Sequence, residues 1–202
     1  TNHQGTVVRI NRDGSIPDDN PSRIRGDDGT VYTPAPGLFS WGHRNAQGIA
    51  RHPETGRIWI HEHGPRGGDE INILRKGANY GWPRVTLGVA YSGREIAEAD
   101  SLPGMVDPLL HWTPSIAPSG MAFVTSATFR EWRGDLLVGA LAGRHLRRVA
   151  LTDEGEVSGE EVLFSGFARF RDVRSAPDGA IFVVTDESPD GGVYLLERRE
   201  RN

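Results

Sequence analysis

The chain of 202 residues contains no cysteine, so it forms no disulfide and offers no thiolate ligand for a metal. No apolar run approaches the ~20 residues that a membrane-spanning helix needs. Charge of one sign is not in excess either, because 23 basic residues oppose 27 acidic ones and leave a net charge of −4. Proteins that bind nucleic acid usually present a basic surface, so the composition argues against that class.

Long helical periodicity is also scarce. The best helical candidate, residues 92–100, makes one or two turns at most. Short apolar or alternating runs recur instead, and turn sequences such as RDG, PETG and RGGD separate them. These runs predict strands at residues 6–10, 57–61, 70–74, 120–124, 135–141, 145–151, 180–186 and 192–197. The sequence therefore predicts an all-β protein, with glycine and proline in tight connections.

The predicted strands fall into a loose internal repeat. One copy is GIARHPETGRIWIHEHG (48–64) and another is DVRSAPDGAIFVVTDES (172–188), each followed by a further strand. A third, more diverged copy covers residues 120–151. Units of about 40 to 50 residues with this order of strands and turns are typical of the blades of a β-propeller. A β-sandwich, in which hairpins also recur, is the alternative at this point.

Two long segments interrupt the repeat, at residues 79–90 and 102–119. Both are rich in glycine, proline and tryptophan. Long loops of this kind on a β scaffold usually carry function.

The stretch EHGPRGGDEIN (62–72) concentrates polar groups beside glycine. It suits a solvated hairpin loop, and it also suits a calcium site, because calcium binds six to eight oxygens from carboxylates, carbonyls and water. Gly64 and Pro65 can expose adjacent carbonyls, and Asp69 and Glu70 can add carboxylates.

Two arginine-containing stretches are candidates for anion binding. The first is GHRNAQG (42–48), in which Arg44 offers a planar charged fork for carboxylate or polarised carbonyl oxygens. The second is FARFRDV (167–173), in which Arg169 and Arg171 would share one side of a strand. Two like charges side by side need an anion or carboxylates to offset their repulsion. The alternative is a solvated loop in the first case and a solvated strand face in the second.

Several common catalytic motifs are absent from the sequence. It contains no G-x-S-x-G, no G-x-G-x-x-G and no P-loop. His61 and His63 have the spacing H-x-H, but a third zinc ligand at a sensible distance is missing.

Six stretches, in order along the chain, together resemble the soluble glucose and aldose sugar dehydrogenases that use pyrroloquinoline quinone (PQQ). They are GTVVRINRDGSIPDDNP, GHRNAQG, EHGPRGGDEIN, KGANYGWP, WTPSIAPSGM and RFRDV. The resemblance implies a six-bladed β-propeller with PQQ near its axis. Residues 1–202 would be the C-terminal part of that single domain, an incomplete ring of about three to four blades without its N-terminal blades.

The resemblance also implies roles for individual residues. Arg44 and Asn45 match the pair that contacts the quinone oxygens, and His63 matches a polar contact to the cofactor. Arg169 and Arg171 match the pair that holds the PQQ carboxylates.

Further matches concern calcium and the loop beside the cofactor. The carbonyls of Gly64 and Pro65 match the ligands of the calcium that PQQ binds. Glu70 and the carbonyl of Tyr80 resemble a second, structural calcium site. Two other residues, Trp112 and Ser115, fall in the loop that flanks the cofactor.

This chain departs from the family in two respects. Arg144 stands in the loop where some members place a lysine that reaches the cofactor. The histidine that serves as general base in the family is expected upstream of this chain, so the catalytic residue is not identified here. We therefore expect the chain alone to be inactive.

The implied reaction is oxidation of an aldose at C1 to a lactone, with a soluble electron acceptor, in a periplasmic or secreted protein. The implied partners of the chain are the absent blades or a second copy of itself. Two other functions stay open from the residues alone. One is a non-enzymatic propeller that binds carbohydrate or protein, and the other is a calcium-dependent hydrolase of the lactonase type.

Overall fold

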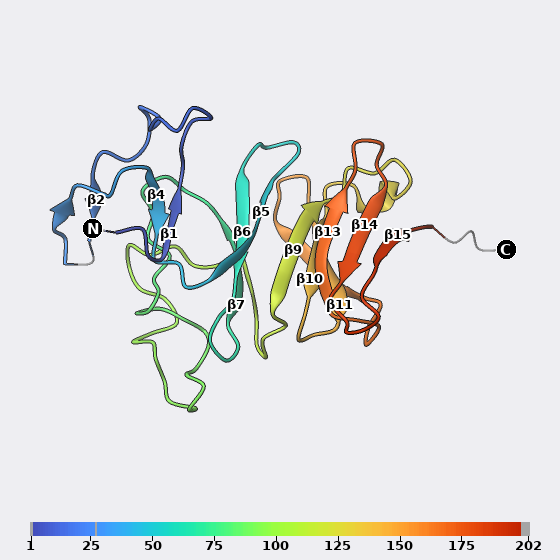
Figure 1. Cartoon of the computed structure of the whole chain (residues 1–202). Coiled ribbons are helices and arrows are strands. Elements are labelled where there is room, and N and C mark those ends of the chain that lie inside the picture. The colour runs from blue at the N-terminus through green and yellow to red at the C-terminus, as the bar shows by residue number, and fades with distance from the viewer. Residues whose placement is uncertain (1, 27, 199–202) are drawn as a thin grey trace.

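The computed structural model describes residues 2–26 and 28–198, and this part of the chain is almost entirely β (Figure 1). Its one helix is a single 3₁₀ turn at Arg130–Trp132. Residues 92–100, the best helical candidate, form no helix. The all-β prediction is therefore confirmed. Within the described residues no helix is long and apolar enough to cross a membrane.

The N-terminal part forms two small antiparallel pairs. Strand β1 (Thr6–Val8) pairs with β4 (Leu38–Trp41). Between them the chain makes the hairpin of β2 (Ile24–Arg25) and β3 (Val31–Tyr32).

Three larger antiparallel sheets follow, and in each the strands are neighbours in chain order. The first sheet consists of β5 (Ala46–Arg51), β6 (Ile58–Glu62), β7 (Asp69–Ile73) and β8 (Leu110–Trp112). The second consists of β9 (Pro118–Phe123), β10 (Leu136–Ala140), β11 (His145–Leu151) and β12 (Val157–Leu163). The third consists of β13 (Phe170–Ser175), β14 (Ile181–Thr185) and β15 (Val193–Leu196).

The first strands of the three sheets lie beside one another: β5 contacts β9, and β9 contacts β13. Successive meander sheets with adjacent first strands are the blades of a β-propeller, here two of four strands and one of three. The structure thus confirms the propeller over the sandwich. Successive strands within a blade run in opposite directions. The segment before the first strand and the loop after the second strand therefore lie at the same end of the blade, which is the lower end in Figure 1.

The hydrophobic core lies between the blades. Alternate residues of β6 and β7, such as Trp59 and Ile71, face the second blade and pack against Met121 and Leu136. The rings of Trp59 and Phe123 meet edge to face, with centroids 5.4 Å apart. A second cluster fills the space between the second and third blades. It contains Val124, Phe129, Leu137, Leu146, Phe170, Val173, Ile181 and Val183.

Some strands do not appear among the predicted ones. Strand β12 (VSGEEVL) is polar because it is the outer edge strand of its blade, and most of its residues are exposed or half-buried. Strand β8 is only three residues long and pairs with β7 across the long connection 74–109. Periodicity carries little signal in such short or exposed strands.

His61 is a polar group in the core between the first two blades. Its side chain is completely buried, and neither ring nitrogen has a hydrogen-bond partner among the described residues. Burial penalises the charged imidazolium and lowers the pKa of His61 from 6.5 to about 4.

This pKa predicts a pH-dependent stability. Between pH 6.5 and 4 the unfolded chain binds a proton at His61 and the folded chain does not, so the free energy of unfolding falls as the pH falls. At pH 4.5 the loss from this histidine should be roughly 2–3 kcal/mol relative to pH 7. Urea unfolding at both pH values should show a smaller loss for His61→Asn. The exposed His3 gives the control variant His3→Asn, and an equal loss in all three proteins would contradict the prediction.

Candidate functional site

The polar segments singled out in the sequence meet at one end of the blades. Asn45 directly precedes β5, residues 63–68 join β6 to β7, residues 113–117 lead into β9, and Arg169 directly precedes β13. Several hydrogen bonds connect these segments and the strands that they precede. His63 Nε2 lies 2.6 Å from the Pro118 carbonyl oxygen.

Another of these bonds ties the middle blade to the third one. The hydroxyl of Ser119 donates to the carbonyl of Phe170, at 2.6 Å. Phe170 points into the core, and the arginines on either side of it, Arg169 and Arg171, remain partly exposed. The alternation predicted for this strand is therefore confirmed, and the arginine pair lies next to the strand that contacts His63.

Asp69 holds the loops of the first two blades together. Its carboxylate is completely buried and accepts four hydrogen bonds. One oxygen accepts from the backbone N–H of Gly64, at 3.0 Å. The other accepts from the hydroxyl of Ser115 and from the N–H groups of Ile116 and Ala117, at 2.7, 2.8 and 3.0 Å. Both carboxylate oxygens of Asp69 are thus engaged in ordering the loops. Its contribution to a calcium site stays a prediction.

Gly64 is packed where no side chain fits. A Cβ at this position would overlap the carbonyl oxygens of Gly67 and Gly68. Both of these glycines have positive φ, at 84° and 69°, which turns the loop back over Gly64. The glycines of the EHGPRGGDEIN stretch are therefore required by the tight loop itself.

Arg44 is directed toward this loop. Its Nη1 donates to the carbonyls of His63 and Gly64, each at 2.9 Å, and its guanidinium lies 5.3 Å from the ring centroid of Trp82. The Arg44 backbone N–H donates to Glu62 at 2.6 Å. The Gly64 carbonyl, expected to face calcium, accordingly has a cation beside it already. Its neighbour Pro65 is buried.

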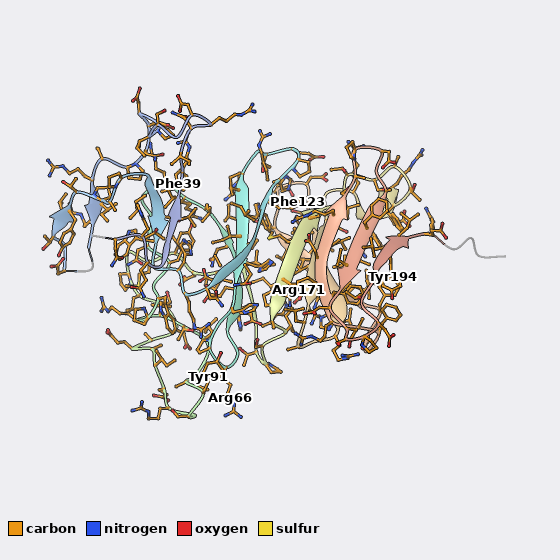
Figure 2. All side chains as sticks on the ribbon, in the orientation of Figure 1. Phe39, Arg66, Tyr91, Phe123, Arg171 and Tyr194 are labelled. Carbon is orange, nitrogen blue, oxygen red and sulfur yellow. The ribbon has the colours of Figure 1, made fainter. Side chains whose placement is uncertain are left out.

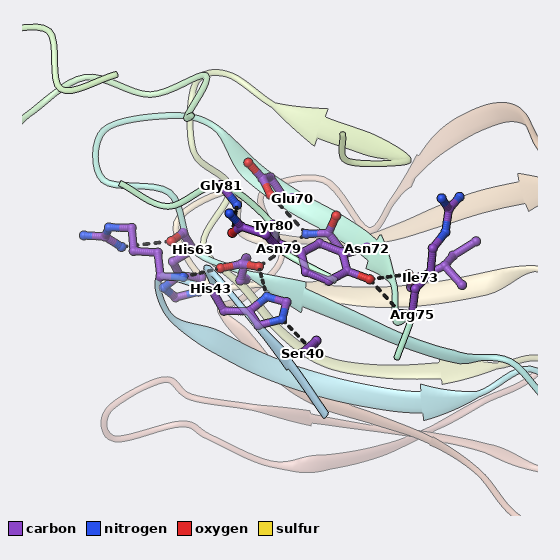
Figure 3. Close-up of polar contacts among 12 residues, drawn as sticks. Ser40, His43, His63, Glu70, Asn72, Ile73, Arg75, Asn79, Tyr80 and Gly81 are labelled. Carbon is purple, nitrogen blue, oxygen red and sulfur yellow. Dashed lines mark hydrogen bonds and ion pairs between the residues drawn. The ribbon is translucent and has the colours of Figure 1, made fainter. Parts of the chain in front are cut away.

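Glu62 also completes a contact chain that the sequence did not reveal. Ser40 Oγ lies 2.9 Å from His43 Nε2, and His43 Nδ1 lies 2.9 Å from Glu62 Oε1 (Figure 3). The order of groups resembles a serine nucleophile with its base. All three side chains are buried, Ser40 completely, so the hydroxyl is out of reach of a substrate. These contacts from Ser40 through His43 to Glu62 instead fix the backbone that carries Arg44.

A small cavity of about 10 Å³ lies behind the loop, enough for one water or ion. Its lining includes Glu62, Gly64, Glu70 and Tyr80. Burial, and after it the nearby Glu62 carboxylate, raises the pKa of Glu70 from 4.5 to about 7. The buried carboxylate of Glu62 and the half-buried one of Glu70 at one cavity fit a cation. A cluster of three or more metal-binding side chains is absent from residues 2–26 and 28–198, so carbonyls or water would have to complete the ligand set.

The arginine pair at the third blade is answered by carboxylates from the end of β14. Both Arg169 and Arg171 reach the same oxygen of Asp186. Glu187 accepts from the Arg169 N–H at 2.8 Å and pairs with Arg144 at 2.7 Å. Arg144, the residue at the position of the family lysine, therefore lies in the same network.

The structure changes the interpretation of three predicted residues. Trp112 lies in strand β8 and not in a loop: it is 6% exposed, packs in the core, and donates its indole N–H to Glu160 at 2.7 Å. Its place beside a cofactor stays a prediction. Ser115 donates to Asp69 and orders the loop. Asn45 is exposed at the expected end, and its side-chain oxygen accepts from Gln47 at 2.8 Å.

The fold and the site define a β-propeller with arginine side chains and a tight glycine-rich loop at one end of its blades. The family model for glucose/sorbosone dehydrogenases matches residues 1–195, and the chain belongs to this family. The chain is 42% identical to the aldose sugar dehydrogenase YliI of Escherichia coli over 191 residues, which are 92% of this chain and 49% of that protein. An uncharacterized protein of Synechocystis is 44% identical over 196 residues, 96% of this chain and 46% of that protein. The chain therefore spans about half the length of these curated relatives.

Two solved structures of sugar dehydrogenases are similar to this chain in fold. A crystal structure of a glucose dehydrogenase matches with a TM-score of 0.87 and 44% identity, over 97% of this chain and 55% of that one. The PQQ-bound form of an aldose sugar dehydrogenase from Streptomyces coelicolor matches with a TM-score of 0.70 and 26% identity, over 95% of this chain and 51% of that one.

The contacts of Asp69 predict a large effect of a small change. In Asp69→Asn an amide NH₂ group replaces one carboxylate oxygen. This NH₂ group is a donor, and it faces backbone N–H groups that donated to the lost oxygen. We expect a loss of about 3 kcal/mol in the free energy of unfolding, because charge-assisted buried hydrogen bonds are lost. Urea unfolding measures it. Asp153→Asn, at an exposed carboxylate, is the control and should change stability little; similar values for both variants would contradict the prediction.

Proposed function

We propose that the chain binds PQQ and calcium and forms part of an enzyme that oxidises aldose sugars at C1 to lactones, with a soluble electron acceptor. The observation that carries this proposal is the placement of two cationic groups at the same end of the blades: Arg44 before the first strand of the first blade, and the pair Arg169–Arg171 at the first strand of the third. A rigid polycarboxylate with a polar quinone edge suits such a site. When bound, PQQ supplies the two-electron acceptor.

Each residue has a proposed role toward the cofactor. Arg169 and Arg171 bind carboxylates, since guanidinium groups match them in shape and charge. Arg44 and Asn45 orient the quinone oxygens. His63 contributes a polar contact and is itself held by the Pro118 carbonyl.

Calcium has two proposed positions. One uses the carbonyls of Gly64 and Pro65 beside the cofactor. The other uses Glu70 and the carbonyl of Tyr80 at the small cavity, where burial and the neighbouring Glu62 carboxylate raise the pKa of Glu70 to about 7. A cation bound there would offset both effects. The second position has the better support, because the Gly64 carbonyl accepts from Arg44 in the structure.

The two other functions find less support. A calcium-dependent lactonase would need acidic and amide ligands that converge at the axis, and the described residues contain no such group of carboxylates and histidines. A propeller that only binds carbohydrate or protein does not require the arginine pair. We also propose a periplasmic or secreted location, as the resemblance implies.

The binding test uses titration calorimetry and PQQ absorbance on the whole chain. We expect PQQ to bind in the presence of calcium. Arg171→Gln should weaken binding about 10- to 100-fold, because a charge-assisted hydrogen bond is lost, and Glu70→Gln should weaken calcium binding. Arg198→Gln, at an exposed arginine paired with Glu131, is the control. No PQQ binding by the unmodified chain would refute the proposal.

We predict that the chain alone does not oxidise sugars even with PQQ and calcium. The histidines near the site are not free to act as a base: His43 and His61 are buried, and His63 is bonded to Pro118. A missing positioned base costs about 10²–10⁴-fold in rate. Dye reduction with glucose and other aldoses tests this, with the E. coli aldose sugar dehydrogenase as the positive control. Turnover comparable to that enzyme would show that the chain does contain a base.

We further propose that the chain associates with a second copy of itself when no other blades cover it. Within the described residues strand β15 pairs only with β14, and its residues Val193, Tyr194 and Leu195 are 69%, 39% and 48% exposed. Open apolar edges favour pairing between chains. Sedimentation velocity should show association that Leu195→Lys reduces and Glu197→Lys does not. A monomer at every concentration would contradict this.

A further inference from the structure

Asp186 and Glu187, the carboxylates that pair with the arginines, are also held in place by hydrogen bonds to the Arg169 backbone. The Asp186 backbone N–H donates to the Arg169 carbonyl, at 2.7 Å, and the Arg169 N–H donates to Glu187. The short segment after β14 is thus tied to the start of β13 from both sides. The Asp186 carboxylate is accordingly held next to the two guanidinium groups, at high effective concentration.

The carboxylate lies where a ligand carboxylate would bind. Arg169 Nη2 is 3.7 Å from Asp186 Oδ2, and Arg171 Nη2 hydrogen-bonds to that same oxygen. Both guanidinium groups are 41–47% exposed, so an external anion can reach them from solvent. Figure 2 shows Arg171 in the lower part of the blades, toward the end that carries the site.

We propose that Asp186 is a built-in counter-ion that competes with the anionic ligand for Arg169 and Arg171. In the absence of ligand it offsets the repulsion between the two arginines. A ligand carboxylate must either displace it or bind beside a like charge. Either route costs binding free energy, so the affinity lies below what the two arginines alone would provide. This inference deepens the proposed function and rests on its assignment of the arginine pair to PQQ carboxylates.

The local charges set the size of the effect. Arg144, Arg169 and Arg171 oppose Asp186 and Glu187, which leaves one net positive charge on five groups. Removal of the Asp186 charge doubles it. A unit charge about 5 Å from a ligand carboxylate in a partly solvated site changes the dissociation constant by about tenfold.

The test measures anion binding to the whole chain for Asp186→Asn. We expect PQQ and citrate to bind about tenfold more tightly than to the unmodified chain, and the salt dependence of binding to become steeper. A purely structural role of Asp186 would not steepen the salt dependence. Asp190→Asn, at an exposed carboxylate four residues further along, is the matched control and should change neither quantity. Circular dichroism checks that the variants fold.

The outcomes separate the two proposals. If citrate binds and Asp186→Asn tightens it, while PQQ does not bind, the counter-ion role stands and the proposed cofactor is wrong. If PQQ binds to the unmodified chain and Asp186→Asn leaves it unchanged or weakens it, the proposed function stands and Asp186 is not a competitor. If neither anion binds to either protein, the inference is overturned.

Discussion

The arrangement of the site depends on one buried carboxylate. Asp69 begins β7, and it accepts hydrogen bonds from the loop before that strand and from the segment that leads into β9. These four donors come from two blades that share no strand pairing. A buried carboxylate needs such donors, and the loops need an acceptor for backbone N–H groups away from water. Each requirement is met by the other, so the end of the blades has a defined shape.

A second constraint is the distribution of charge at this end. Glu62 and its partner His43 lie inside, and Arg44 extends outward from them. At the third blade Arg169 and Arg171 face outward and are met by Asp186. The buried interior therefore carries carboxylates and the accessible rim carries cations. This polarity suits a metal ion held below an anionic organic ligand, and it follows from side chains that the propeller topology places together.

The sequence predicted the blades well because their second strands, β6, β10 and β14, are rich in buried apolar residues and are bounded by turns. It also indicated the tight loop, because glycine is the residue that turns and close backbone approaches require. At Gly64 and Gly68 a Cβ would overlap backbone atoms of the neighbouring loop residues. It failed where a residue's partner comes from another blade. Trp112 has the appearance of a loop aromatic, yet Glu160 of the next blade accepts from it in the core. A partner within the same blade can also escape the sequence: no local pattern relates Arg171 to Asp186, fifteen positions further along.

The Gly64 carbonyl shows how these constraints meet. It accepts from Arg44 in the structure, and a divalent cation beside a guanidinium would be repelled by it. If calcium binds at this carbonyl as we propose, Arg44 has to turn away from the loop. The ring of Trp82, which the Arg44 guanidinium already contacts, is the surface against which it can remain packed. The tight packing around Gly64 allows the loop itself little movement. Rearrangement therefore falls to the arginine side chain, which is then released to meet the oxygens of a ligand bound at the metal.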